Sequence, residues 1–295
     1  MSRTTAYTGS FSQKWADFNA LVKTRLSATV VFSSVMAYMI AVNGSLVVLN
    51  IIVLAIGGFF VTAAANVLNE VLERDFDKLM KRTSDRPLAS GRMDISNAVL
   101  LAGLMSLVGI TFLALFNPAT SLLGTIALVS YAFMYTPMKR YNSSAVTVGA
   151  IAGALPTLIG CVAAEGKVTW LGLTLFGIQF LWQYTHFWSI AWLGFEDYHK
   201  AGYKFIPEEN GKASKNIGIQ ALIFALLLIP IAAIPFYLGE TGVVSMIVVM
   251  ILSIVFSYFA WNFYQKFDRK SALRLMFSSF FYIPLVLIIY FFDKL

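Results

Sequence analysis

The chain has 295 residues, of which 58% are hydrophobic and only 13% are charged, and its formal net charge is +7. Soluble globular domains carry about twice this share of charged residues, so the composition excludes an ordinary soluble protein and predicts a membrane protein. We expect no nucleic-acid partner, because the basic loops of a membrane protein serve its topology and contact anionic lipid headgroups of the bilayer.

Apolar runs of about 20 residues, each long enough to cross a bilayer as a helix, follow one another along the chain. In chain order they cover residues 26–43, 46–66, 96–116, 119–138, 144–164, 168–193, 217–238, 242–262 and 272–292. The sequence therefore predicts an all-α polytopic membrane protein with nine transmembrane helices, forming a single domain over residues 1–295.

The distribution of positive charge predicts the orientation, because Lys and Arg in short loops are retained on the cytoplasmic side. With the N-terminus in the cytoplasm, 20 of the 22 Lys and Arg residues fall inside, and only Lys167 and Lys294 fall outside. We therefore expect a cytoplasmic tail over 1–25, long cytoplasmic loops at 67–95 and 194–216, and a place in the bacterial cell inner membrane.

The cysteine content excludes two kinds of site. The single Cys161 lies within the fifth apolar run, so neither an internal disulfide nor a cysteine metal cluster is available.

The stretch NEVLERDFDKLMKRTSDRPLASGR, residues 69–92, is the most charged part of the chain. Asn69, Glu73 and Asp77 follow the spacing i, i+4, i+8, so they lie on one face if the second helix continues beyond the bilayer. Stacked like charges destabilise an isolated helix, and a cation relieves that cost. Oxygen ligands without His or Cys favour Mg2+, which takes one or two carboxylates and completes its shell with water and phosphate oxygens.

Cationic side chains in the same loop are candidates to bind a diphosphate. They are Arg74, Lys78, Lys81, Arg82, Arg86 and Arg92. The alternative is a solvated loop whose charges of mixed sign pair only with one another.

This stretch resembles the first signature of the UbiA superfamily of intramembrane aromatic prenyltransferases, an Asn-x-x-x-Asp-x-x-x-Asp run. The motif RT-x-x-RPL-x-x-GR, from Arg82 to Arg92, is similar to the branch of that family that farnesylates haem. The segments LVKTRLSATV, YTPMKRYNSSAVTVGAIAGALPTLIG and THFWSIAWLGFEDYHKAGYKFIP resemble the same branch in the same order.

The resemblance implies a helical bundle around a central cavity and an enzyme of the prenyl transferase class. In the implied reaction, farnesyl diphosphate loses its diphosphate, the farnesyl group joins a vinyl side chain of haem b, and water adds to give haem O. Haem b is then a substrate, Mg2+ is the cofactor, and a haem A synthase is an implied partner that oxidises the product further.

The resemblance also assigns residues. Asn69, Glu73 and Asp77 are implied metal ligands and catalytic residues, and Asp197 in the second loop is a further catalytic candidate. Glu73 stands where the family usually has Asp, and Ala201 stands where the family's second loop has a second acid. The sequence therefore does not predict a second magnesium site built only from carboxylates.

The remaining substrate-binding candidates lie in the loops or near helix ends. They are Arg74, Lys78, Arg82, Arg86, Lys139, Arg140, His186 and Tyr198. Lys139 and Arg140 are either topogenic charges or ligands of the diphosphate or of haem propionates. His186 is either a structural residue or a contact to haem iron, a propionate or the diphosphate.

Several aromatic residues of the sixth run are candidates to line an apolar tunnel or to pack the core. They are Phe180, Trp182, Tyr184, Phe187 and Trp188.

Three other functions remain open from the residues alone. The first is prenylation of another acceptor, such as a quinone precursor. A membrane transporter is the second, although transporters place charges at the bilayer midplane more often than at the cytoplasmic rim. The third is a structural subunit that handles haem without catalysis.

Overall fold

The computed structural model describes residues 10–295, and these are almost entirely helical. The helices are α1 (Phe11–Leu21), α2 (Thr24–Ala41), α3 (Val48–Asp77), α4 (Ile95–Ala114), α5 (Pro118–Val129), the π-helix η1 (Ser130–Tyr135), α6 (Thr136–Met138), α7 (Ser144–Glu165), α8 (Trp170–Leu193), α9 (Phe195–Lys200), α10 (Asn216–Ile231), α11 (Ile234–Tyr237), α12 (Val243–Lys266) and α13 (Arg269–Phe292). A short antiparallel hairpin pairs β1 (Glu208–Glu209) with β2 (Lys212–Ala213).

Eight spans, rather than the predicted nine, are long and apolar enough to cross a membrane by length and composition within residues 10–295. The helix in the predicted sixth run, α8, has 24 residues but is not among them. Its length suits a span, but polar groups such as those of Gln179, Gln183 and His186 make it less apolar than its neighbours. The protein is thus an integral membrane protein whose α8 differs in composition from the other long helices.

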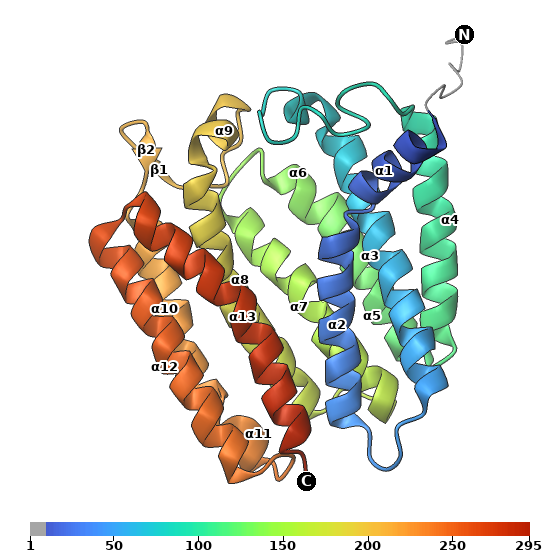
Figure 1. Ribbon diagram of the computed structural model, residues 1–295, viewed down its shortest axis with the longest axis vertical. Helices are drawn as coiled ribbons and strands as arrows, with labels where there is room; N and C mark the ends of the chain where they lie inside the picture. The colour runs from blue at the N-terminus through green and yellow to red at the C-terminus, as the bar shows by residue number, and fades with distance from the viewer. Residues whose placement is uncertain (1–9) are drawn as a thin grey trace.

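The long helices run between two ends of an elongated bundle (Figure 1). The loop between α3 and α4, the short helix α9 and the β1–β2 hairpin lie at one end, whereas α11 and the C-terminus lie at the other. The two long loops predicted from the sequence therefore meet at the same end of the molecule.

Helices α2 and α7 form the seam between two hydrophobic cores. One core draws on α3, α4 and α5, the other on α8, α10, α12 and α13, and both include residues of α2 and α7. Small side chains let these two helices approach closely. A methyl group added at Gly160 of α7 would lie 2.1 Å from the backbone oxygen of Ser34 in α2.

Helix α3 is longer than the apolar run 46–66 predicted for it, and it continues to Asp77. The predicted loop 67–95 therefore begins with three further turns of helix. The polar face of these turns is buried against other elements, with Asn69 donating to Thr136 Oγ1. Asn66, just before them, donates to the backbone oxygen of Val22 and to Ser27 Oγ.

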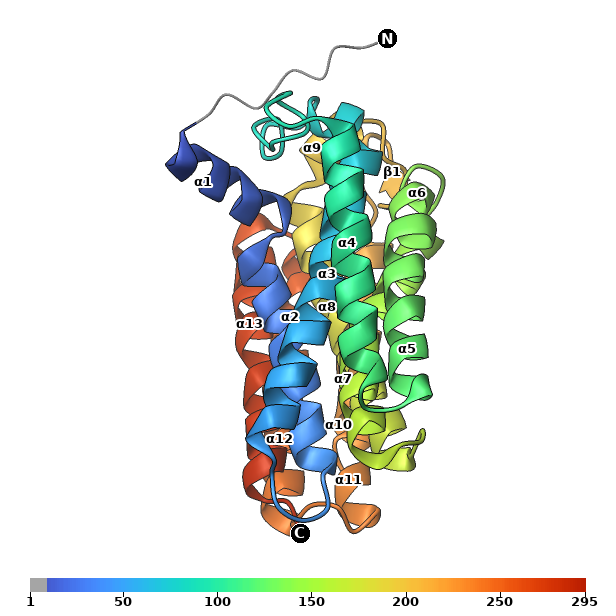
Figure 2. The same cartoon turned by 90° about the vertical axis from the view of Figure 1, so that its right-hand side faces the viewer.

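Part of the predicted cytoplasmic tail also forms a helix, α1, which lies at an angle outside the bundle (Figure 2). Residues 1–9 of that tail lie outside the described residues. Asp17 of α1 is buried and accepts hydrogen bonds from Arg92 at 2.9 and 3.1 Å. This ion pair attaches α1 to the loop between α3 and α4.

We expect Gly160→Ala to destabilise the bundle, because the added methyl group meets the backbone of α2 rather than a movable side chain. Overpacking of this kind costs about 1–3 kcal/mol. The measurement is the thermal unfolding temperature of the purified protein in detergent. Gly103→Ala in α4 is the matched control, because nothing lies within 4 Å of its added methyl group. Equal unfolding temperatures for the two variants would contradict the close approach of α2 and α7.

Candidate active site

The three residues predicted from their spacing, Asn69, Glu73 and Asp77, lie on one buried face of α3. Their exposed fractions are 2%, 4% and 1%. Asn69 Nδ2 donates to Glu73 Oε2 at 2.9 Å and to Thr136 Oγ1 at 3.1 Å. The continued helix thus places the predicted oxygen-rich stripe inside the protein.

A fourth polar residue on this face, Glu70, was not identified from the sequence. Its exposed fraction is 1%. Seven residues separate it from Asp77, and at about 100° per residue the two side chains point within roughly 20° of each other. The sequence signal for Glu70 is its i, i+7 spacing from Asp77, which lies outside the i, i+4, i+8 pattern of Asn69, Glu73 and Asp77.

Cationic side chains from other elements surround the carboxylates. Lys139 pairs with Glu73. Arg86 Nη1 lies 2.8 Å from Asp77 Oδ2, and Arg86 Nε lies 3.7 Å from Glu70 Oε1. Burial acts to lower the pKa of the Arg86 guanidinium, but the nearby Asp77 and Glu70 carboxylates hold this pKa above its usual value.

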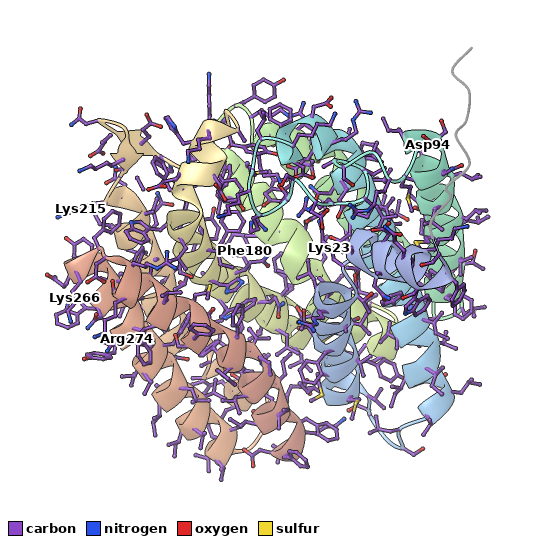
Figure 3. The ribbon with its side chains drawn as sticks, turned by 45° about the horizontal axis from the view of Figure 1, so that its top comes forward. Lys23, Asp94, Phe180, Lys215, Lys266 and Arg274 are labelled. Atoms are coloured by element: carbon purple, nitrogen blue, oxygen red, sulfur yellow. The ribbon has the colours of Figure 1, made fainter. Side chains whose placement is uncertain are left out.

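Lys23 joins the cluster from the turn between α1 and α2, near the middle of this end of the bundle (Figure 3). Its Nζ donates to Asn69 Oδ1 at 2.9 Å. Its backbone has a φ of 48°, a left-handed conformation that costs a residue with a side chain about 1–2 kcal/mol. Burial and the neighbouring Arg86 lower the pKa of its ammonium group to about 8.

The π-helix η1 helps to bring residues of the fourth predicted span to this cluster. π-Helical turns are rare and occur often at functional sites. Thr136, directly after η1, donates its hydroxyl to the backbone oxygen of Tyr131 at 2.9 Å while it accepts from Asn69. Lys139 then lies 4.8 Å from the centre of the Tyr135 ring.

Four buried carboxylate oxygens of the cluster have no hydrogen-bond partner among residues 10–295. Two of them, Glu70 Oε1 and Glu73 Oε1, are ion-paired with Arg86 and Lys139, which leaves Asp77 Oδ1 and Glu70 Oε2 without either kind of partner. Buried acceptors are normally satisfied, so these atoms indicate room for a ligand. No three His, Cys, Asp or Glu side chains in the described chain are arranged to hold a metal alone. Mg2+ that also binds a diphosphate needs only one or two protein carboxylates. The carboxylates on α3 therefore fit a magnesium ion that is bound together with a diphosphate.

Other predicted diphosphate ligands are not brought to the cluster. Arg74 and Lys78 bind the exposed Asp75 at 3.1 and 2.9 Å, on another face of α3. Successive side chains of an α-helix point about 100° apart, so Arg74 points to a different face from its neighbour Glu73. Arg92 is occupied by Asp17 and Asp85.

The two predicted loops touch each other. Arg82 Nη2 donates to Tyr198 Oη at 3.1 Å, and the rings of Phe76 and Tyr203 lie 5.3 Å apart. The centre of the Tyr203 ring also lies 5.6 Å from Lys139 Nζ. Tyr203 was not among the candidates predicted from the sequence.

Asp197 is placed differently from the α3 carboxylates. It is half-buried in α9, and its side chain has no hydrogen bond or ion pair with other described residues. The loop contact therefore does not bring its carboxylate into a bond with the buried cluster.

Arg140 is directed at α3 rather than at solvent. Its Nη2 donates to the backbone oxygen of Leu72, and its guanidinium lies 4.1 Å from the centre of the Phe76 ring. It therefore adds positive charge behind the buried carboxylates.

His186 lies between α8 and α13. Its Nδ1 is 2.6 Å from Ser279 Oγ, and its ring stacks on Trp182 with centroids 4.9 Å apart. Phe187, on the next face of α8, lies 6.3 Å from Tyr135. Phe187 thus connects the aromatic side of α8 to the charged cluster, whereas Tyr184 stacks on Phe224 at 3.9 Å as part of the core.

Hollows elsewhere on the molecule are not part of this cluster. One of about 680 Å3 lies between α12 and α13, and one of about 530 Å3 lies beside Arg74 and Lys78. Neither is lined by Asn69, Glu73 or Asp77. The chemistry of the buried cluster, and not the size of a hollow, therefore identifies the candidate site.

The chain is similar in sequence to known proteins of one family. A model of the UbiA prenyltransferase family matches residues 30–283. The chain is 40% identical over 276 residues to a protoheme IX farnesyltransferase of Cytophaga hutchinsonii, covering 93% of this chain and 96% of that relative. It is 38% identical over 285 residues to the enzyme of the same name from Flavobacterium psychrophilum, covering 94% of each.

Solved structures show the same fold at low sequence identity. A UbiA homologue from Archaeoglobus fulgidus, bound to GPP and Mg2+, has a TM-score of 0.72 and 15% identity, covering 92% of this chain and 99% of its own. A structure described for digeranylgeranylglyceryl phosphate synthase has a TM-score of 0.79 and 19% identity, covering 95% and 98%. The all-α polytopic fold is therefore shared with these proteins.

We expect Lys139→Met to lower the thermal unfolding temperature in detergent, because it leaves the buried Glu73 carboxylate without its cation. Breaking a buried pair from one side costs about 3–5 kcal/mol. The double variant Lys139→Met with Glu73→Gln should lose less stability than the two single variants together. Strict additivity of the three unfolding measurements would show that the two side chains do not interact.

Proposed function

The chain belongs to the UbiA prenyltransferase family, and from that premise we propose that it transfers the farnesyl group of farnesyl diphosphate to haem b. A vinyl side chain of haem b accepts the group, water adds, diphosphate leaves, and haem O is formed. Relatives named for this activity, at 37–40% identity over more than 90% of the chain, support this acceptor over a quinone precursor.

The observation that carries the proposal is the buried face of α3 with its unpartnered oxygens. Charges inside an apolar bundle are costly and mark a functional site by default. Here three carboxylates, those of Glu70, Glu73 and Asp77, lie beside Lys139 and Arg86. Neither a transporter nor a passive haem-binding subunit needs this donor set.

Asn69, Glu73 and Asp77 would hold Mg2+ together with the diphosphate of the donor. When bound, Mg2+ supplies positive charge that neutralises the leaving diphosphate. The solved UbiA homologue with GPP and Mg2+ supports this choice of ion. The unpartnered Asp77 Oδ1 supports Asp77 as the ligand that is most available.

The nearby cations complete the diphosphate site. Arg86 and Lys139 form ion pairs with the α3 carboxylates and neutralise them. When the diphosphate binds, their donor groups turn to its oxygens and stabilise the charge that develops as the C–O bond breaks. Lys23, which already donates to Asn69, adds a third donor from the turn between α1 and α2.

The remaining candidates from the sequence take lesser roles in this proposal. Arg82 and Tyr198 hold the two loops together over the site. Arg140 supports α3. Asp197 approaches the diphosphate only if the loops close further on binding, and Arg74 and Lys78 interact with the diphosphate only as it enters or leaves.

The farnesyl chain would lie among apolar and aromatic side chains below the charged cluster. An allylic cation survives only where water is excluded until the new carbon–carbon bond has formed. Tyr135 and Phe187 provide such a surface directly beneath Lys139, and their ring faces also stabilise positive charge.

We propose that the chain has the membrane orientation predicted by its charge distribution. It crosses the membrane nine times, with α8 as one of the crossings, and the end of the bundle that holds the carboxylates lies in the cytoplasm. This places the site where soluble farnesyl diphosphate is available, in a bacterial inner membrane. A haem A synthase would take the product from the bilayer.

The direct test is to incubate membranes that contain the protein with haem b, farnesyl diphosphate and Mg2+. Mass spectrometry should detect the hydroxyethylfarnesyl product, and chelation of Mg2+ should abolish it. A membrane preparation that contains folded protein and forms no farnesylated haem would refute the proposed acceptor.

Asp77→Ala should lower turnover by about 10²-fold or more, because it removes a ligand that acts on the developing charge. The protein should still be found in the membrane fraction in normal amounts. Asp75→Asn is the matched control, because Asp75 lies on the same helix but is exposed and bound to Arg74 and Lys78. Turnover by the Asp77 variant equal to that of the control would contradict the metal assignment.

Single cysteines test the orientation with little background, because the native Cys161 is fully buried. Lys81→Cys and Ser45→Cys place thiols at exposed positions on opposite ends of the bundle. A membrane-impermeant maleimide should label position 81 only in inverted vesicles and position 45 only in right-side-out vesicles. The reverse pattern would invert the proposed topology.

A further inference from the structure

Two polar side chains on α8, Gln183 and His186, lie in surroundings that are otherwise mostly apolar. Three residues separate them, so they are neighbours on one face of the helix. Gln183 Oε1 is buried and has no hydrogen-bond partner among residues 10–295. An unsatisfied buried acceptor of this kind calls for an explanation, such as a water molecule or a catalytic role.

The packing of α7 places Gln183 below the charged cluster. A methyl group added at Gly149 would lie 2.7 Å from the Tyr135 ring, and one added at Gly153 would lie 2.1 Å from Gln183 Nε2. Gly149 and Gly153 are one helical turn apart, or roughly 6 Å along α7. Since Tyr135 lies against Lys139, the Gln183 amide lies about one turn deeper than the proposed diphosphate site.

Ser279 is the hydrogen-bond partner of one ring nitrogen of His186. Ser279 Oγ lies 2.5 Å from the backbone oxygen of Met276 and 2.6 Å from His186 Nδ1, and its single proton can be donated to only one of them. When it is donated to Met276, His186 Nδ1 carries the ring proton and Nε2 carries a lone pair. Nε2 has no hydrogen bond with the described residues, and the ring is held between Trp182 and Phe280.

We propose that Gln183 and His186 hold the water molecule that completes the transfer, with Gln183 Oε1 orienting it and His186 Nε2 taking its proton. This assignment rests on the proposed function. A bound water usually needs two or more polar partners, and these two acceptors provide them beside apolar rings. The oxygen lone pair of the water is then free to face the substrate.

The steps balance as follows. The C–O bond of farnesyl diphosphate breaks and its electron pair leaves with the diphosphate. The π electrons of the haem vinyl group form the new C–C bond, which leaves a cation on the vinyl carbon next to the porphyrin. A lone pair of the water forms a C–O bond to that carbon, and one water proton passes to His186 Nε2. If water is not in place, the cation instead loses a proton from its neighbouring carbon and forms an alkene.

The alkene product is lighter than haem O by one water, so the ratio of the two products reports on the held water. In Gln183→Leu we expect farnesyl transfer to continue while the ratio of alkene to alcohol rises about tenfold or more, less than the roughly 10²–10⁴-fold of a general base, because Gln183 only orients the water. His186→Gln should shift the ratio in the same direction. Mass spectrometry of haem extracted from membranes with full-length protein, haem b, farnesyl diphosphate and Mg2+ measures both products.

Gly153→Ala is a second route to the same result that preserves the polar groups and favours helix formation. The three atoms nearest to its added methyl group all belong to the movable end of Gln183, so we expect the amide to be displaced while the helices stay packed. Thr185→Val is the matched control. It removes a buried hydroxyl of α8 that donates to Ala221 O at 2.9 Å, on a face directed at α10, and it should leave the ratio unchanged.

The outcomes separate the two proposals. A wild-type protein that forms no farnesylated haem refutes the proposed function itself. A wild-type protein that forms haem O, with an unchanged alkene fraction in Gln183→Leu and Gly153→Ala, overturns the role of Gln183. Parallel loss of both products in these variants, with Thr185→Val unaffected, also overturns it, because Gln183 would then serve substrate binding and not the water.

Discussion

Burial of three carboxylates on one face of α3 is the constraint on which this structure depends. Glu70, Glu73 and Asp77 lie inside an apolar bundle, where an uncompensated charge costs several kcal/mol. Lys139, directly after α6, and Arg86, from the loop after α3, supply the compensation. Because each carboxylate needs a partner from another element, the charges hold the loop and the end of the fourth span against α3.

The same ion pairs suit the proposed reaction. A site for a magnesium diphosphate needs both cationic and anionic groups, and here these groups neutralise each other in ion pairs. Binding then requires an exchange of partners and not the burial of new charge, so little reorganisation is needed as the diphosphate leaves. The unpartnered oxygens of Asp77 and Glu70 are the acceptors that these ion pairs leave for a ligand.

Small residues on α7 connect this charged layer to the apolar layer beneath it. Gly149 lets Tyr135 lie flat against the helix, and Gly153 does the same for Gln183 one turn deeper. The charged layer would bind the leaving group, while the deeper layer excludes bulk water and holds one polar amide and one imidazole. This division gives the two halves of the proposed transfer separate surroundings, one charged and one apolar.

Local patterns were enough to predict the membrane class, the positions of the long helices and the stripe formed by Asn69, Glu73 and Asp77, because hydropathy and helical period are properties of short segments. They did not predict that α3 runs on to Asp77 as a buried helix, that Arg86 and Lys139 reach the stripe whereas Arg74 does not, or that Asp197 makes no bond to it. Those outcomes depend on how distant helices pack and on which face of α3 is covered. Arg74 is next to Glu73 in the chain but points away from it, whereas Lys139 is far along the chain and pairs with it. The physical reason is that a buried carboxylate is not solvated by water, so the fold must bring a cation from another element to compensate its charge.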